Sequence, residues 1–345
     1  MKNKKIKIHV KNNHWAPGSF PVDEEGEKVF TIRNADFEKA FEKFPKIKEN
    51  VEIFFDWDED NFKSSMSNSN ILLAWNFPTL NLQKISPSLK WIHCISAGIE
   101  HLHPLDWMFN ELVLTNNSGI HSKKAGEYGL MSILMLQNHL PKIITNQKNK
   151  KFVSLFSNPI SGKTIVVAGT GALGRSMIKL LAPLGAKIIG VNKRGGNVEG
   201  CSKIVTTNKI ESVLPDADFL YLALPETLET KNLINHKRLN LLKPSCGIVN
   251  IGRQSVVDYD ALCEKLKNNE LAGAILDVFS PEPIEPNSKL WNTPNLVITP
   301  HVSSDDGESY VRLTLELFVK NLELFITKKP LVNQIDKNDT AKILG

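Results

Sequence analysis

The sequence predicts an α/β protein of two domains, the larger of which is built on a doubly wound parallel sheet. Its 345 residues exceed one ordinary hydrophobic core, and a hydrophobic share of 41% is enough to build two. Residues 163–301 alternate short apolar runs with helical patterns, which is typical of a parallel sheet with crossover helices. The first half of the chain is less regular, and it favours a smaller α/β domain.

Six apolar runs are expected to be the strands of the larger sheet. Each run is short, rich in branched or aliphatic residues, and bounded by Gly, Pro or Asn. The runs cover residues 164–168, 187–191, 219–223, 247–251, 273–278 and 296–299. A helix with one apolar face is expected over residues 172–184, and Gly185 would end it.

The remaining elements are expected to complete the smaller domain and the connections. Strands are expected at residues 6–10, 51–55 and 71–74, and an amphipathic helix at 36–44. Residues 129–140 are apolar on nearly all sides, which favours a helix buried between domains or subunits. The segment 307–327 has the spacing of a long helix that Asp305 or Asp306 would cap, and we expect it to cross back to the first domain. The expected domains are therefore 1–118 plus 306–345, and 119–305.

Composition and charge exclude several classes of function. A formal charge of +5, from 42 basic and 37 acidic residues without a dense basic stripe, argues against nucleic-acid binding. The longest apolar stretch, 130–136, is too short to span a bilayer, and the amino terminus lacks the apolar core of a signal peptide, so we expect a cytoplasmic chain with no membrane partner. No metal site is expected, because His101 and His103 have no third ligand beside them. Four widely spaced cysteines are expected to be reduced and mostly buried, namely Cys94, Cys201, Cys246 and Cys263.

A glycine-rich loop predicts a dinucleotide site. In GTGALG, Gly169, Gly171 and Gly174 have the spacing GxGxxG, directly after an expected strand and at the start of an expected helix. The first glycine permits the tight turn, the second lets the backbone approach a pyrophosphate, and the third lets the helix pack on the sheet. Ala172 and Leu173 open that helix, whose free amides would face the phosphates. The alternative is a glycine-rich turn without a ligand.

The end of the second strand predicts which dinucleotide binds. Asn192 lies 23 residues after Gly169, where an acid would accept hydrogen bonds from the ribose hydroxyls and repel a 2'-phosphate. Asn192 removes that repulsion, and Lys193 and Arg194 can pair with a phosphate. We therefore expect NADP as the preferred cofactor and NAD as the other. The alternative is a solvated basic turn.

Three polar residues are expected to converge at the same edge of the larger sheet. Arg253, Glu282 and His301 each follow a different expected strand, and parallel strands end at the edge where the glycine loop would hold a cofactor. Arg253 can bind a substrate carboxylate or keto oxygen, and His301 can donate a proton while Glu282 raises its pKa. This chemistry suits reduction of a 2-oxo acid. The separate alternatives are a surface arginine, a loop acid and a strand-end cap.

Five ordered segments give the chain a resemblance to a known family. They are TIVVAGTGALGRS, LALPETLETKNLIN, GIVNIGRQSVVDYDAL, LAGAILDVFSPEP and LWNTPNLVITPHVSS. Together they resemble the D-isomer-specific 2-hydroxyacid dehydrogenases, from about residue 89 to 333. Arg253, Glu282 and His301 match the catalytic triad of that family. The resemblance implies two Rossmann-like domains, a doubly wound nucleotide domain and a smaller, discontinuous, flavodoxin-like substrate domain. It also implies NAD(P)H-dependent reduction of a small 2-oxo acid, of the glyoxylate or hydroxypyruvate type.

The same resemblance implies roles for further residues. The amides of Ala97 and Gly98 would bind the substrate carboxylate, Arg253 and His301 would also contact the substrate, and Asp277 would orient the nicotinamide carboxamide. Four residues are expected to border the rest of the cofactor, namely Leu224, Pro225, Thr227 and Ile251. Residues 128–156 would form a homodimer interface. The sequence departs from the family at Gln254, where glycine is common, and at 303–310. The alternative function is a nucleotide-sensing binding module on the same fold.

Overall fold

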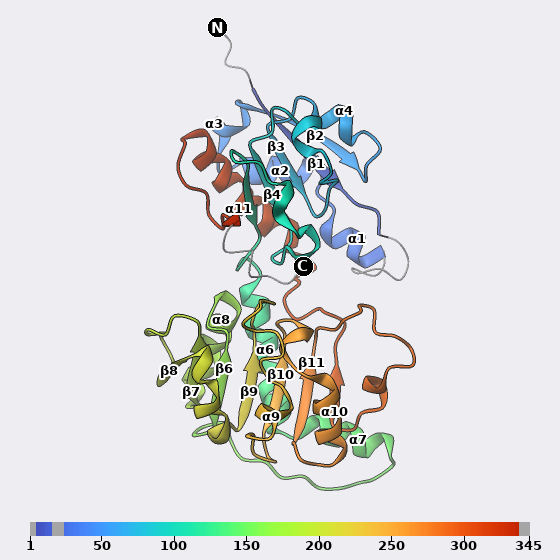
Figure 1. Cartoon of the computed structure of the whole chain (residues 1–345), viewed down its shortest axis with the longest axis vertical. Helices are drawn as coiled ribbons and strands as arrows, with labels where there is room; N and C mark the ends of the chain where they lie inside the picture. Colours follow the sequence, from blue (N-terminus) through green and yellow to red (C-terminus); the bar gives the residue numbers. More distant parts are fainter. Residues whose placement is uncertain (1–4, 16–23, 338–345) are drawn as a thin grey trace. The chain divides into compact units, whose positions relative to one another are not determined.

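The computed structural model describes residues 5–15 and 24–337 (Figure 1). The chain divides into two compact units. Unit 1 combines residues up to His121 with residues from Asp306 onward, and unit 2 is Ser122–Asp305. Each unit is built on one sheet of parallel strands, so the expected α/β class with two Rossmann-like domains is confirmed.

Unit 1 contains a five-stranded sheet in the order β2-β1-β3-β4-β5, which is the flavodoxin-like order. Its strands are β1 (Ile6–Asn12), β2 (Val51–Trp57), β3 (Ile71–Ala74), β4 (Trp91–Cys94) and β5 (Val113–Asn116). The sequence analysis did not expect β4 and β5. The polar residues His93 and Thr115 interrupt the apolar pattern of these two strands. Both are completely buried, and they can be so because they hydrogen-bond to each other at 2.8 Å.

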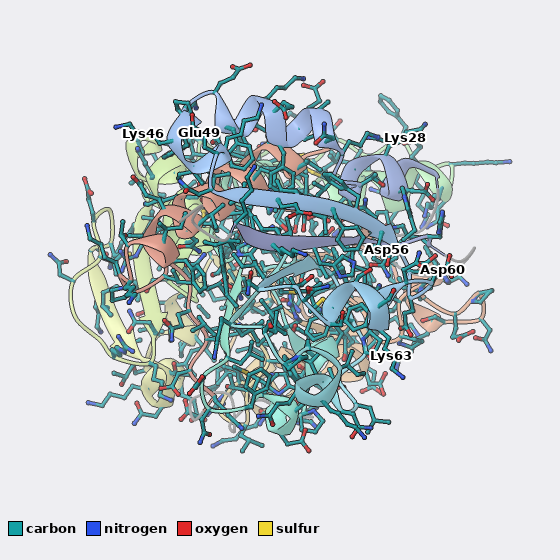
Figure 2. The ribbon with its side chains drawn as sticks, turned by 90° about the horizontal axis from the view of Figure 1, so that it is seen from above. Lys28, Lys46, Glu49, Asp56, Asp60 and Lys63 are labelled. Atoms are coloured by element: carbon teal, nitrogen blue, oxygen red, sulfur yellow. The ribbon has the colours of Figure 1, made fainter. Side chains whose placement is uncertain are left out.

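Strands β1 and β2 extend beyond the expected ends for a similar reason. Lys11 and Asn12 are buried although they are polar, so β1 continues past the apolar run. The imidazole of His9 lies 3.6 Å from the carboxylate of Asp56 in β2, and burial lowers the pKa of His9 to about 4 although Asp56 opposes this. Figure 2 labels Asp56 in β2 and Lys63 in the following helix α4 (Phe62–Met66). Where buried polar residues pair in this way, a pattern of apolar residues does not predict the end of the strand.

Helices cover the sheet of unit 1. They are α1 (Glu24–Phe30), α2 (Asn34–Phe41), α3 (Pro45–Lys48), α4, α5 (Leu82–Ile85) and α11 (Tyr310–Ile326), with short 3-10 turns at Glu100–Leu102 and Leu105–Trp107. The expected helix 36–44 begins two residues earlier and ends before Pro45. Helix α11 packs against α2, and Phe318 stacks on Trp91 of β4. The expected helix 307–327 begins three residues later, at Tyr310, and its N-cap is Ser309, so neither Asp305 nor Asp306 caps it. Asp306 instead accepts the amides of Glu308 and Ser309 in the turn before α11.

Unit 2 contains a seven-stranded sheet in the order β12-β11-β10-β9-β6-β7-β8, the doubly wound dinucleotide-binding order with a seventh strand. Its strands are β6 (Thr164–Ala168), β7 (Lys187–Asn192), β8 (Lys203–Thr206), β9 (Phe219–Leu222), β10 (Gly247–Asn250), β11 (Gly273–Leu276) and β12 (Leu296–Ile298). All six expected strands are present; β6 has the expected bounds, and the carboxyl ends of the other five differ from the expected ones by one or two residues. The short edge strand β8 was not expected.

The helices of unit 2 connect these strands. They are α6 (Ser122–Gln137), α7 (Leu140–Lys148), α8 (Ala172–Leu181), α9 (His236–Leu239) and α10 (Tyr259–Lys267), with 3-10 turns at Ala182–Leu184, Thr207–Ser212, Leu214–Asp216, Gln254–Val256 and Lys289–Asn292. The expected helix 172–184 is α8 followed by a 3-10 turn, because Pro183 cannot continue the α-helical bonding. The expected helix 129–140 starts earlier, at Ser122, and ends where His139 adopts φ +56°.

The cysteines and the helices bear on two expectations. Cys94, Cys246 and Cys263 are buried, Cys201 is half-buried, and all four thiols are free. The expectation of reduced, mostly buried thiols is therefore confirmed. Of the helices that the structure describes, none combines the length and the apolar character that a membrane crossing needs.

Candidate active site

The glycine loop follows β6 and fits a phosphate group. A Cβ on Gly169, which has φ +98°, would lie 2.3 Å from the carbonyl oxygen of Ala223, and a Cβ on Gly174 would lie 2.0 Å from the oxygen of Gly169. In contrast, a Cβ on Gly171 would meet no described atom within 4 Å. Gly171 is the N-cap of α8 and no side chain caps this helix, so the first helical amides, including those of Ala172 and Leu173, are left for a ligand.

The side chain of Asn192 organises the turn after β7. Its Oδ1 accepts the amides of Arg194, at 3.0 Å, and of Gly195, at 2.6 Å. Its Nδ2 donates to Oγ1 of Thr170 in the glycine loop at 2.8 Å. An asparagine here therefore shapes the basic turn and ties it to the phosphate loop. The sequence alone predicts only that Asn192 stands where an acidic residue would otherwise contact the ribose.

The two basic side chains of this turn differ in their surroundings. Nζ of Lys193 lies 3.1 Å from a carboxylate oxygen of Glu229, and both side chains are more than half exposed. The side chain of Arg194 is exposed, and within the described part of the chain it takes part in no hydrogen bond or ion pair. Arg194 is therefore the basic group of this turn that a phosphate can bind without breaking an existing pair.

The loop after β9 holds the residues expected to border the adenosine. Thr230 stiffens this loop, because its Oγ1 donates to the carbonyl of Pro225 at 2.6 Å and accepts the amide of Thr227 at 2.8 Å. Leu224 is buried in the core of unit 2, whereas Pro225 is exposed and Thr227 is half-buried. Ile251, the residue after β10, is also buried. Within this set, Pro225 and Thr227 are the more accessible to a ligand.

Asn250, at the end of β10, holds the turn that carries Arg253. Its Oδ1 accepts the amide of Gly252 at 3.1 Å, and its Nδ2 donates to the carbonyl of Arg253 and to the hydroxyl of Tyr259, both at 3.0 Å. Gln254 opens a 3-10 turn and is not among the described residues with positive φ. The departure from glycine at this position therefore creates no backbone strain. Sequence reasoning missed the roles of Asn250 and Tyr259.

His301 and Glu282 form a hydrogen-bonded pair. Nδ1 of His301 lies 2.8 Å from Oε2 of Glu282, and the other carboxylate oxygen accepts the amide of Phe279 at 2.7 Å. Burial lowers the pKa of His301, but the hydrogen bond and charge of Glu282 outweigh it, so the pKa lies above its usual value; Arg253 opposes this rise. A histidine held in this way can keep a proton near neutral pH and release it to a substrate.

Asp277 fixes the turn in which this histidine lies. Its side chain is completely buried, and it accepts the hydroxyl of Thr299, at 2.5 Å, and the amides of Val302 and Ser303, both at 3.0 Å. The hydroxyl of Thr299 lies 2.6 Å from that of Tyr128 in α6. The turn needs this support because the histidine has φ +54°, a left-handed conformation that costs energy for a non-glycine residue. Sequence reasoning gave Asp277 only a contact with the cofactor.

The sequence predicts Asp305 only as a possible helix cap, but its carboxyl group interacts electrostatically with His301. Burial raises the pKa of Asp305 to about 6, His301 and Lys124 oppose the rise, and Asp277 adds to it. A carboxyl group with this pKa can change its charge close to neutral pH. The sequence indicates this charged neighbour of His301 only through the departure of segment 303–310 from the family pattern.

The loop of Ala97 and Gly98 belongs to unit 1, where it follows β4. The carbonyl of Ala97 accepts a hydrogen bond from Asn116 at 2.6 Å, and the carbonyl of Gly98 accepts one from Ser96 at 2.5 Å. Among the described residues, no acceptor is paired with the amides of Ala97 or Gly98. The residues 5–15 and 24–337 contain no group of three or more side chains placed to hold a metal ion.

Comparisons with known proteins agree with this geometry. Residues 130–303 match the NAD binding domain of the D-isomer specific 2-hydroxyacid dehydrogenases. A glyoxylate reductase of Thermofilum pendens is 32% identical over 244 residues, which cover 69% of this chain and 72% of that protein. A solved 2-hydroxyacid dehydrogenase family protein of Aeromonas salmonicida superposes with a TM-score of 0.77 at 26% identity, over 97% of this chain and 99% of the other. The fold is also that of an NADPH-dependent glyoxylate/hydroxypyruvate reductase of Sinorhizobium meliloti, solved with NADP and sulfate (TM-score 0.76, 23% identity, 97% and 99% covered).

Proposed function

The chain belongs to the D-isomer specific 2-hydroxyacid dehydrogenase family, whose enzymes depend on a nicotinamide cofactor, and we propose that it reduces a small 2-oxo acid of the glyoxylate or hydroxypyruvate type to the D-2-hydroxy acid. The observation that carries this proposal is the bond between His301 and Glu282. It supplies a proton donor at the sheet edge where Arg253 and the glycine loop also lie.

In this proposal the residues of unit 2 bind the substrate and move its proton. The cofactor, when bound, supplies the hydride. The guanidinium of Arg253 binds the carboxylate or keto oxygen, and Nε2 of protonated His301 donates a proton to the keto oxygen. Glu282 stabilises the imidazolium before the transfer and fixes the ring through Nδ1. In the reverse direction neutral His301 is the base. Asp277 adds a contact with the carboxamide.

The proposed preferred cofactor is NADPH. Asn192 carries no charge to repel a 2'-phosphate, and Arg194 has an exposed guanidinium without a partner among the described residues. The ion pair of Lys193 with Glu229 is exposed, and such pairs contribute only about 0–1 kcal/mol, so a phosphate can displace it. The neighbour from Sinorhizobium meliloti was solved with NADP, which supports the same choice.

We also propose a homodimer through residues 128–156. Phe152 and Phe156 have relative exposures of 104% and 90%, in a connection between α7 and β6 that forms no helix or strand. Two fully exposed aromatic rings this close in sequence favour an interface with a second copy. The four free thiols fit a reducing compartment, so we propose the cytoplasm.

A cofactor and substrate panel tests the proposal. The purified chain is mixed with NADPH or NADH and with glyoxylate, hydroxypyruvate or pyruvate, and oxidation is followed at the nicotinamide absorbance. Turnover is expected with NADPH, and His301→Ala should abolish it. Binding of the cofactor without turnover of any short 2-oxo acid contradicts the proposal and favours a nucleotide-sensing protein.

Cofactor preference has its own variant. Arg194→Ala should raise KM for NADPH more than KM for NADH, because only NADPH carries the 2'-phosphate. Lys203→Ala, on the edge strand β8, is the matched control and should change neither constant. Equal effects of Arg194→Ala on the two cofactors would remove the phosphate assignment.

A further inference from the structure

A side-chain hydrogen bond joins the cofactor loop to the turn of Arg253. Oγ of Ser255 donates to Oε2 of Glu226 at 2.6 Å, and both residues are half-buried. Glu226 lies between two residues expected to border the adenosine, Pro225 and Thr227. Ser255 lies two residues after Arg253. A hydroxyl donating to a carboxylate at this distance is a strong hydrogen bond. It therefore links two loops that serve different parts of the proposed reaction.

Backbone bonds hold the same two segments together. The amide of Asn232 donates to the carbonyl of Ser255 at 2.6 Å, and the amide of Ile234 donates to that of Val256 at 2.9 Å. Ile234 and Val257 form an isolated parallel bridge. The segment that continues the cofactor loop therefore acts as a short strand partner for the residues after Arg253.

The start of the two loops is in direct backbone contact. A Cβ on Gly252 would lie 2.5 Å from the carbonyl oxygen of Leu224 and 2.8 Å from its nitrogen. No side chain separates the residue before Arg253 from the residue that opens the cofactor loop. The bonds of Thr230 within that loop keep it stiff. A displacement of the loop at Leu224 is therefore transmitted to Gly252.

We propose that Glu226 and Ser255 are positioning residues that couple cofactor binding to the placement of Arg253. The inference rests on the proposed function and deepens it. Residues 224–227 would border the bound cofactor, so cofactor binding would restrict the position of Glu226. Glu226 in turn holds Ser255 and the turn that carries Arg253. The guanidinium of Arg253 is then in position to bind the carboxylate of the 2-oxo acid. Neither positioning residue needs to touch the substrate.

Removal of this bond should act mainly on the 2-oxo acid. In Ser255→Ala and Glu226→Ala, each of which removes one partner of the bond, kcat/KM for the acid should fall about tenfold, or about 1.4 kcal/mol, with most of the loss in KM for the acid. KM for NADPH should change less than twofold. The double variant should be no worse than the worse single variant, because both changes break one bond.

Matched substitutions elsewhere in unit 2 control for general damage. Ser212→Ala removes an exposed hydroxyl bonded to Lys209, and Glu264→Ala removes an exposed acid on α10. Neither should change the kinetics. Loss of thermal stability without the KM shift would assign the bond a purely structural role. An equal rise of KM for NADPH would place its effect on the cofactor instead of Arg253. Either result overturns the inference.

Hydrogen exchange gives a readout that needs no turnover. NADPH should slow amide exchange at residues 252–257 in the parent protein, and this protection should be lost in Ser255→Ala while protection at residues 169–174 remains. Equal protection in parent and variant, or none at 252–257 in the parent, would refute the coupling. Failure of the parent to bind NADPH or NADH is a distinct outcome, which removes the proposed function and the coupling with it.

Discussion

Replacement of Gly171 by alanine should weaken cofactor binding without destabilising the protein. Its φ of −74° and ψ of −161° are accessible to alanine, and the added methyl group would meet no described atom within 4 Å. The free energy of unfolding should therefore change by less than about 0.5 kcal/mol. The methyl group would lie beside the first amides of α8, which are left for a ligand. Loss of one charge-assisted hydrogen bond costs about 1.5–3 kcal/mol, so the dissociation constant of NADPH should rise about 10- to 100-fold.

Gly174→Ala is the matched opposite case. Its Cβ would lie 2.0 Å from the carbonyl oxygen of Gly169, well inside the 3.4 Å at which ordinary contact begins, so α8 must move. Overpacking of this kind costs about 1–3 kcal/mol of unfolding free energy. Urea denaturation and calorimetric titration with NADPH measure both quantities for both variants. The reasoning is refuted if Gly171→Ala binds NADPH as tightly as the parent, or if Gly174→Ala is as stable as the parent.

Three further predictions concern other parts of unit 2. In the proposed reduction His301 donates the proton, so kcat/KM should fall as pH rises through the pKa of His301. Glu282→Gln removes the main cause that raises this pKa, so the fall in kcat/KM should move to lower pH. Asp277→Asn places an amide donor against backbone and hydroxyl donors, so urea denaturation should show a loss of about 2–3 kcal/mol of stability. Phe152→Ser combined with Phe156→Ser should convert a dimer to a monomer in sedimentation, without loss of monomer stability, because both rings are exposed.

Each of these predictions has a control and a contrary outcome. Glu285→Gln should leave the pH profile of kcat/KM unchanged. An unchanged profile in Glu282→Gln would contradict the assignment of His301 as the proton donor. Asp260→Asn, at a side chain 82% exposed, should cost little stability. An equal loss of stability in Asp277→Asn and Asp260→Asn would contradict the support of the His301 turn by Asp277. Leu80→Ser, at a side chain 80% exposed in unit 1, should leave the oligomeric state unchanged.

The fold could be predicted where apolar residues alone make a strand. The runs in β6, β9 and β10 are completely or nearly completely buried and apolar, so their pattern is unambiguous. The strands β4, β5 and β8 were missed. In β4 and β5 buried polar residues pair with each other, and β8 has an exposed edge, so their apolar pattern is weak. Such pairing depends on residues more than 20 positions apart, which no local pattern reports.

The candidate site could be predicted at the level of residue types. The strand ends placed Arg253, Glu282 and His301 on one sheet edge, and the 2.8 Å bond between the last two agrees with the expected pairing. The supporting bonds could not be predicted in this way. The left-handed φ of His301 and its support by Asp277 depend on tertiary structure, because the supporting carboxylate directly follows the neighbouring strand β11 and lies more than 20 residues earlier in the chain.

The return of α11 to unit 1 has a consequence for biosynthesis. Leu315, Phe318 and Leu322 of α11 lie in the same buried cluster as Trp91 and the first strands. A ribosome releases the whole of unit 2 before it releases this helix, so unit 2 possesses all its strands while unit 1 still lacks one wall of its core. The unit translated first is therefore expected to finish folding last. Until then the nascent chain presents an uncovered apolar sheet, which is the kind of surface that chaperones bind.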